Sequence, residues 1–210
     1  APAAPSAPAR VQAPEPRLGA LKIPDPRQDT HRARDADVLA FGLLGQPGPW
    51  DELCGASFLA PGFDLGAGGL ALASEGVEHS FKNAEAALQA LRSWAVAGDF
   101  EDLDAEEALA KSKELDGFEL LDGCSGPWQA MQQVLQAKFK SSTKLEKALE
   151  KTGDAILLCH AETPSQWADG TTWSDGGDGE GMNLLGLQLM LLRDRRTGWK
   201  KWTAFIESAV

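Results

Sequence analysis

The sequence predicts a single α+β domain that is mainly α-helical and follows an extended N-terminal arm. Apolar residues recur at helical spacing in several segments, two short apolar runs have the length of buried strands, and seven prolines fall within residues 1–37. A length of 210 residues with 43% hydrophobic content fits one globular domain with an arm. We divide the chain into the arm at 1–37, the domain at 38–194 and an aromatic tail at 195–210.

The arm is rich in proline and alanine, which favours extended or polyproline conformation and prevents a continuous helix. The chain begins at Ala1 rather than Met, and its first residues lack the apolar core of a signal peptide. We interpret this start as that of a processed or trimmed protein. An organelle is then the expected compartment, either the lumen or matrix of a plastid or mitochondrion, with the cytoplasm as the alternative.

The first half of the domain begins with an apolar run at Val38–Leu44, which predicts a buried strand. The Gly-rich segment Phe58–Leu72 has alternating apolar residues and predicts an irregular strand or hairpin. Ser74 has the character of a helix N-cap, so we expect a helix from there to about Ala97. Its apolar stripe consists of Val77, Phe81, Ala84, Leu88 and Leu91.

The second half predicts further helices at 104–114, at Trp128–Phe139 with Pro127 as the first helical residue, and up to Lys151 after a Ser141 or Ser142 cap. A short strand at Ala155–Leu158 and a Gly/Asp/Trp loop at 163–181 follow. The last strong helix is expected at Met182–Arg193.

Composition excludes several classes of function. A net charge of −11 without a basic block argues against non-specific binding to nucleic acid. The longest apolar run, Leu184–Leu192, is far shorter than the roughly 20 residues of a membrane-spanning helix. Three widely spaced cysteines form no Cys-x-x-Cys pair, so we expect neither a zinc site nor a disulfide framework, and no cofactor.

The segment Thr152–Arg193 carries residues that suit a small polar pocket. The Trp167 ring offers a stacking face, Asp169 a charge, and the glycines a close backbone approach. Asn183 lies at the expected helix start, where main-chain amides can meet an anion.

On the helix expected after Ser74, Glu78, Lys82 and Glu85 would share one face. This spacing is typical of a solvated, charge-paired face. A lone histidine such as His79 is more often structural than catalytic.

Taken together, these segments resemble the NADAR family, a group of N-glycosidases named for NAD and ADP-ribose. The family includes enzymes that cleave riboflavin-pathway intermediates and ADP-ribosylated guanine. The resemblance rests on E-H-S-F at Glu78, W-Q-A-M at Trp128, A-K-F at Ala137, T-G-D-A at Thr152, the Trp167 loop, and G-M-N-L-L-G with L-M-L-L-R at Gly181–Arg193.

The resemblance implies roles for particular residues. Glu78 would stabilise positive charge on the ribose, Trp128 and Trp167 would hold the base, and Asp169 would orient or protonate it. The remaining substrate contacts would come from His79, Lys82 and Asn183.

Several positions depart from the family pattern. The family reads E-H-x-x-Q-x-x-K, and with Glu78 as its glutamate the lysine position is Glu85. Cys159 stands for a family glutamate, Pro164 for an aspartate, and Ala168 for a glycine. These changes predict a degenerate pocket and a non-catalytic accessory subunit of a larger assembly. An active N-glycosidase acting on a ribosylated nucleobase is the alternative.

The tail places Trp199, Trp202 and Phe205 at spacings of three residues. This pattern favours a last helix that packs its apolar stripe on the domain. The alternative is an exposed aromatic edge that, with the arm, docks onto the larger assembly.

Overall fold

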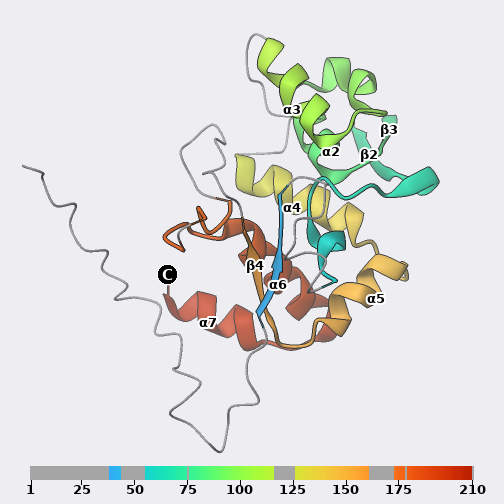
Figure 1. The fold of residues 1–210 in the computed structure, drawn as a ribbon. Coiled ribbons are helices and arrows are strands. Elements are labelled where there is room, and N and C mark those ends of the chain that lie inside the picture. The colour runs from blue at the N-terminus through green and yellow to red at the C-terminus, as the bar shows by residue number, and fades with distance from the viewer. Residues whose placement is uncertain are drawn as a thin grey trace, which may run out of the picture. The chain divides into compact units, whose positions relative to one another are not determined.

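The structure is a computed structural model that describes residues 38–43, 55–74, 76–115, 126–160, 173–177 and 179–209 (Figure 1). The arm predicted at 1–37 lies outside the described residues, as do Trp167 and Asp169. The strands are β1 (Val38–Phe41), β2 (Leu70–Ser74), β3 (Val77–Phe81) and β4 (Ile156–Cys159). The α-helices are α2 (Ala84–Ala90), α3 (Ala105–Glu114), α4 (Pro127–Lys138), α5 (Lys144–Lys151), α6 (Leu184–Thr197) and α7 (Lys201–Ala209).

The two apolar runs predicted as strands pair with each other. β1 and β4 are parallel, from Val38 opposite Ile156 to Phe41 opposite Cys159. Phe41, Leu157 and Cys159 are buried, and α6 packs against β4. The mixed helix and strand architecture confirms the predicted α+β class.

The helix predicted from Ser74 to Ala97 is wrong at both ends, because a hairpin occupies its first part and α2 ends at Ala90, before a separate 3-10 segment at Trp94–Phe100. β2 and β3 form an antiparallel hairpin, with Leu70 opposite Phe81 and Ser74 opposite Val77. In β2, Leu70 and Leu72 are buried while the residues between them are exposed, which is the period of two of a half-buried strand.

α2 begins after the hairpin, and its N-cap is Asn83 rather than Ser74. The Asn83 side chain accepts a hydrogen bond from the Ala86 N–H at 2.8 Å and donates one to the Leu103 carbonyl at 2.9 Å. Of the predicted stripe, Phe81, Ala84, Leu88 and Leu91 are buried, but Val77 is exposed. Those apolar residues therefore belong to the core, yet they reach it from a strand and a shorter helix.

The other predicted helices are present with adjusted ends. α3 starts at an Asp104 capping box with Glu107, and α4 starts at Pro127 as predicted. α5 is capped by Thr143 rather than by Ser141 or Ser142, and α6 begins at Leu184.

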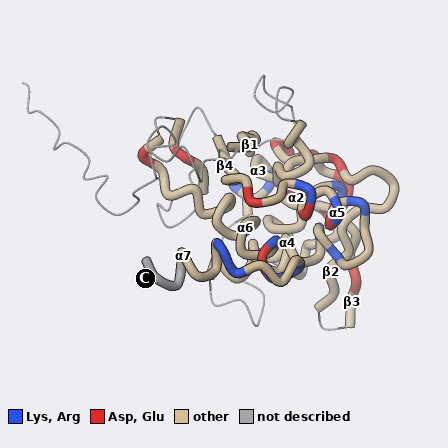
Figure 2. Tube along the Cα trace, turned by 90° about the horizontal axis from the view of Figure 1, so that it is seen from below, with Lys and Arg blue, Asp and Glu red and all other residues tan. Residues whose placement is uncertain are grey.

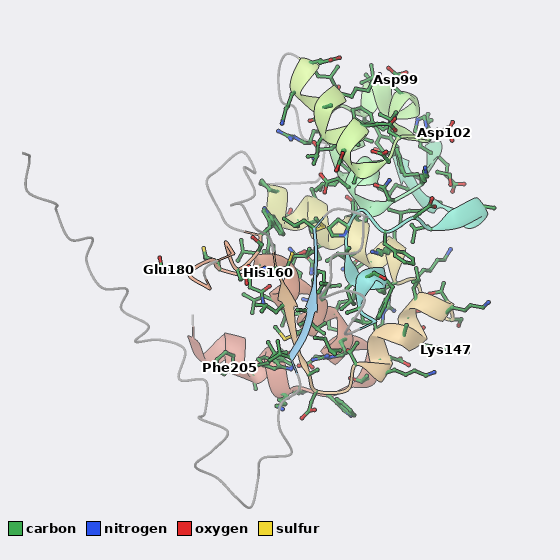
Figure 3. The ribbon with its side chains drawn as sticks, viewed as in Figure 1. Asp99, Asp102, Lys147, His160, Glu180 and Phe205 are labelled. Atoms are coloured by element: carbon green, nitrogen blue, oxygen red, sulfur yellow. The ribbon has the colours of Figure 1, made fainter. Side chains whose placement is uncertain are left out.

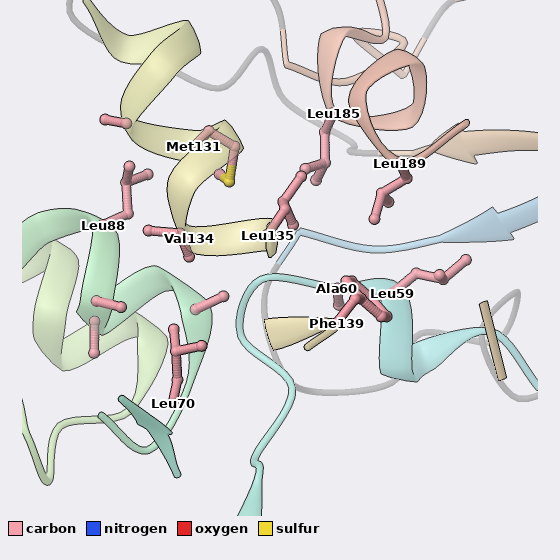
Figure 4. Packing of buried hydrophobic residues seen from close by; sticks show 14 of the residues in the cluster. Leu59, Ala60, Leu70, Leu88, Met131, Val134, Leu135, Phe139, Leu185 and Leu189 are labelled. Atoms are coloured by element: carbon pink, nitrogen blue, oxygen red, sulfur yellow. The ribbon is translucent and has the colours of Figure 1, made fainter. Parts of the chain in front are cut away.

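The central helix of the core is α4, which packs against both α2 and α6. Figure 4 shows Met131, Val134 and Leu135 of α4 between Leu88 of α2 and Leu185 and Leu189 of α6. All six side chains are buried. The site residues described below are carried by, or lie next to, these three helices.

The tail beyond residue 195 is helical. α6 continues to Thr197, so the boundary placed at 194/195 falls inside one helix, and α7 follows it. The Asp194 carboxylate accepts hydrogen bonds from the Trp202 and Thr203 N–H groups at 2.8 Å, and so holds the start of α7. Trp202 packs against the core, whereas Trp199 is exposed.

Charged residues of both signs are dispersed along the described trace rather than collected in one basic run (Figure 2). None of the described helices is long and apolar enough to cross a membrane. Among the residues that the structure describes, no group of three His, Cys, Asp or Glu side chains could hold a metal ion.

Candidate functional site

A hydrogen-bonded row of polar side chains runs along α2 in the interior. The Gln89 amide donates to the Glu85 carboxylate at 2.7 Å, and the Arg92 guanidinium donates to the Gln89 oxygen at 2.9 Å. Arg92 also reaches the Ser112 hydroxyl of α3 at 3.4 Å. Glu85 and Gln89 share one face of α2 at positions i and i+4, and Arg92 reaches Gln89 from the turn after the helix.

Burial changes the pKa of the carboxyl group in this row. Glu85 is only 2% exposed, and desolvation raises the pKa of its carboxyl from 4.5 to about 7. The Gln89 hydrogen bond and the charge of Arg92 act in the opposite direction. A carboxyl group with this pKa can be present in either protonation state near neutral pH, which is the property required of an acid or base catalyst.

The row also changes how the family pattern fits this chain. The pattern E-H-x-x-Q-x-x-K has a glutamate followed by a histidine, a glutamine four residues after the glutamate and a lysine three residues after the glutamine. Glu85 and Gln89 on α2 and Arg92 in the turn after it have this spacing, with Ala86 in place of the histidine and arginine in place of the lysine. Counting from Glu78 instead puts Lys82 at the glutamine position and Glu85 at the lysine position. The sequence allows both alignments, and the structure places Glu85 buried on α2 and Glu78 exposed on β3.

Glu78, His79 and Lys82 occupy β3 and its end, not a helix. Glu78 is exposed opposite Ala73. The His79 Nδ1 lies 2.8 Å from the Glu101 carboxylate, and its ring meets that of Trp94 edge-on at 5.1 Å. Lys82 lies 3.8 Å from Asp64.

A stacked pair of tryptophans joins the start of α4 to the loop before α6. The rings of Trp128 and Trp173 lie 6.3 Å apart between centroids, with 25° between their planes. Trp173 is buried, while Trp128 is 37% exposed and keeps surface for a further stacking partner. The Gln188 amide of α6 donates to the Trp128 carbonyl at 2.8 Å and fixes the start of α4. No role was assigned to Trp173 from the sequence.

The loop from Trp173 to Asn183 is tied to the end of β4. The Asp175 N–H donates to the Cys159 carbonyl at 2.8 Å, and the Asn183 N–H donates to the Ser174 carbonyl at 3.0 Å. The Asn183 side chain accepts from the Cys159 N–H and donates to the Leu157 carbonyl, both at 2.9 Å. Asn183 was expected to contact substrate, but both of its amide atoms bond to the backbone of β4.

His160 follows β4 and pairs with this loop. Its Nδ1 lies 2.8 Å from the Asp175 carboxylate. Figure 3 labels His160 at the end of β4 and Glu180 on the loop that precedes α6. The site within the described residues thus has two parts, the polar row of α2 and the Trp128–Trp173 stack with its loop.

A family model matches most of the domain. The NADAR domain model matches residues 71–196, from β2 to the last turns of α6. The chain belongs to the NADAR family. The matched region contains the α2 row, the tryptophan stack and the loop before α6.

Two relatives illustrate the similarity. A riboflavin biosynthesis protein of Vibrio vulnificus (strain YJ016) is 33% identical over 91 residues, which are 43% of this chain and 23% of that protein. The N-glycosidase YbiA of Escherichia coli (strain K12) is 39% identical over 67 residues, 32% of this chain and 38% of that protein. The similar segments therefore span less than two fifths of either relative.

The NMR structure of the E. coli protein YbiA is similar over a longer stretch. The TM-score is 0.53 at 21% identity, and the match covers 80% of this chain and 92% of YbiA. At this identity the likeness establishes the fold, and the arrangement of the site rests on the residues described above.

Proposed function

We propose that this chain is an N-glycosidase that hydrolyses the bond between a ribose and a nucleobase. The observation that carries the proposal is the Glu85–Gln89–Arg92 row of α2 and the turn after it, which has the family spacing of these three residues and a glutamate whose pKa is raised to about 7. The relatives named as an N-glycosidase and as a riboflavin biosynthesis protein support this class of reaction. Two substrates fit it, a ribosylaminopyrimidine of riboflavin synthesis and ADP-ribosylated guanosine.

The proposed roles follow from the chemistry of the reaction. Cleavage of an N-glycosidic bond builds positive charge on the ribose carbon, and the Glu85 carboxylate would stabilise that charge. Gln89 orients the carboxylate, and Arg92 supplies the positive charge that the family lysine has at this position. The exposed part of the Trp128 ring would stack on the base.

A second candidate is the non-catalytic accessory subunit, and one observation favours it. Glu85 and Gln89 are almost entirely buried, which suits a structural row as well as a catalytic one. In this case the arm at 1–37 and the exposed Trp199 would contact the larger assembly. Pro164 and Ala168, which also motivated this reading, lie outside the described residues.

The test is base release by the full chain from each of the two substrates, measured by liquid chromatography and mass spectrometry. We expect Glu85→Gln to lower kcat/KM by about 100-fold or more, since removal of a charged group from such a site costs orders of magnitude in rate. Gln has nearly the shape of Glu and can bond to Gln89, so the variant is expected to fold.

Two matched variants complete the design. Glu78→Gln tests the glutamate first favoured by the sequence, and Glu106→Gln removes an exposed charge of α3. Loss of activity in Glu78→Gln but not in Glu85→Gln would overturn the assignment to α2. No base release by the wild-type chain from either substrate would reject the hydrolase and leave the accessory subunit.

A further inference from the structure

We propose that His160 and Asp175 form an acid–base pair in which His160 gives the departing base its proton. The inference rests on the proposed N-glycosidase function and adds to it a proton donor that the sequence analysis did not assign. It is carried by the geometry of the loop between β4 and α6.

The first observation is a buried carboxylate with a defined set of bonds. Asp175 is 6% exposed. Its Oδ2 atom lies 2.8 Å from His160 Nδ1, and its Oδ1 atom accepts the Gly177 N–H at 2.9 Å. A charge this far from solvent is stable only when it is paired and hydrogen-bonded.

The backbone around Asp175 holds it in place. Its N–H donates to the Cys159 carbonyl, and its carbonyl accepts the N–H groups of Gly179 and Gly181 at 3.1 and 2.8 Å. On the other side of the pair, the His160 N–H donates to the Phe41 carbonyl at 2.8 Å and continues the β1–β4 pairing. Both partners are thus fixed by main-chain bonds that do not depend on their side chains.

The second observation is the direction of the imidazole. The Nδ1 bond to Asp175 assigns the Nδ1 proton to this contact and leaves Nε2 to act on a ligand, as in other carboxylate–histidine pairs. The His160 side chain is about one third exposed, at 32%. Among the described residues, no hydrogen-bond partner of Nε2 is observed.

The third observation is the distance from a stacking surface. Asp175 follows Trp173 by two residues, so their Cα atoms are at most about 7 Å apart. Trp173 stacks on the partly exposed Trp128. The pair and the tryptophan stack are therefore both tied to one short stretch of the loop before α6, and we place them in one site.

The proposed step balances as a hydrolysis. As the bond between C1′ and the base nitrogen breaks, its electron pair goes to the nitrogen, which takes the proton from His160 Nε2. Water adds to C1′ and releases a proton to solvent, and the imidazole regains a proton from solvent. His160 is the catalytic residue of this step, and Asp175 is a positioning residue that holds the ring.

The experiment uses two substrates of the full chain that differ in their leaving groups. One is the ribosylated nucleobase cleaved by the wild type, whose base must be protonated to leave. The other is 4-nitrophenyl β-D-ribofuranoside, whose leaving group departs as a stable anion. We expect His160→Gln to lower kcat on the nucleobase substrate by about 10²- to 10⁴-fold, the range for general acid catalysis, and to leave nitrophenol release near the wild-type rate.

Asp175→Asn is expected to cause a smaller loss on the nucleobase substrate alone. Asp154→Asn is its control, because Asp154 forms a pair of the same 2.8 Å length with Lys201 at the surface. Equal losses on both substrates, or no loss in His160→Gln, would overturn the pair as a proton donor. A purely structural role lowers both rates together and lowers the melting temperature.

Base release by the wild type tests the proposed function, whereas the ratio of the variant kcat to the wild-type kcat on each substrate tests the His160–Asp175 pair. If the wild type does not cleave one of the two substrates, ¹⁵N NMR of His160 tests the pair in place of the kinetic comparison. Addition of guanosine monophosphate then shifts the Nε2 resonance of the wild type if the pair faces a nucleoside site. An unchanged resonance rejects the pair.

Discussion

At the scale of single residues, Asn183 shows how a family motif can be structural. Its backbone is left-handed, with φ of 50°, a conformation that asparagine tolerates better than most residues. Its side chain bonds to both Leu157 and Cys159 of β4. The G-M-N motif was read as an anion site at a helix start, but here it fastens the loop to the parallel strand pair.

Replacement of Asn183 by Ala should destabilise the protein by roughly 2–4 kcal/mol, because two backbone groups of β4 lose their partners and alanine disfavours the left-handed backbone. Urea unfolding followed by tryptophan fluorescence measures the change. Met182→Ala, at the exposed neighbouring position, is the control and should change stability little. A loss below about 0.5 kcal/mol in Asn183→Ala, the usual range for surface substitutions, would contradict this account.

At the scale of elements, α6 lies unusually close to β4. A Cβ atom at Gly186 would come within 2.0 Å of the Leu157 carbonyl oxygen and 2.5 Å of the Asn183 amide. Arg193, further along α6, donates to Thr152 and to the Ala155 carbonyl, at the turn that precedes β4. The T-G-D-A, L-L-G and L-L-R motifs are therefore parts of one helix–strand contact.

Gly186→Ala should destabilise the fold by about 3 kcal/mol or more, since the added methyl group forces α6 away from β4. Thermal unfolding measures the effect. The matched control is Gly68→Ala, where nothing lies within 4 Å of the added Cβ. A melting temperature of Gly186→Ala equal to that of the wild type would show that the contact is not tight in solution.

At the scale of the whole molecule, two buried ionisable groups change the stability of the fold with pH in opposite directions. Burial raises the pKa of Glu85 from 4.5 to about 7 and lowers the pKa of Lys138 from 10.5 to about 7. Lys138 donates to the Ala60 carbonyl at 2.5 Å and lies near the Phe63 and Phe139 rings. Burial therefore makes the folded state favour the neutral form of each group.

The signs follow from proton linkage. The stability that Glu85 contributes is fully present below pH 4.5 and is lost as pH rises through 7, because the folded state holds the proton longer. Charging Lys138 destabilises the fold below pH 7, and this penalty is relieved as pH rises from 7 to 10.5. The two contributions together make the free energy of unfolding lowest near neutral pH.

Urea unfolding across pH 4 to 10.5 tests this dependence of stability on pH. The free energy of unfolding of Glu85→Gln minus that of wild type should rise by about 3 kcal/mol between pH 4.5 and 7. The same difference for Lys138→Met should fall by roughly 3–5 kcal/mol between pH 7 and 10.5. Differences that stay constant with pH would show that neither group has the stated pKa.

The sequence predicted much of this molecule because local patterns decide those features. The α+β class, the strands at Val38 and Ala155, and the helix after Pro127 follow from apolar period, length and turn residues, which are properties of neighbouring residues. The predicted strand or hairpin at Phe58–Leu72 overlaps only the start of β2. The second strand, Val77–Phe81, was assigned to a helix because its apolar residues also fit a helical stripe, and pairing with β2 decides that it is a strand.

The site divides in the same way. The sequence by itself contained the Glu85–Gln89–Arg92 spacing, but two glutamates competed for it, and only burial on α2 distinguished the buried one from the exposed Glu78. The Trp128–Trp173 stack and the His160–Asp175 pair join residues 45 and 15 positions apart, respectively. No local pattern encodes such contacts, because they form only when the loop before α6 folds back onto β4 and the start of α4.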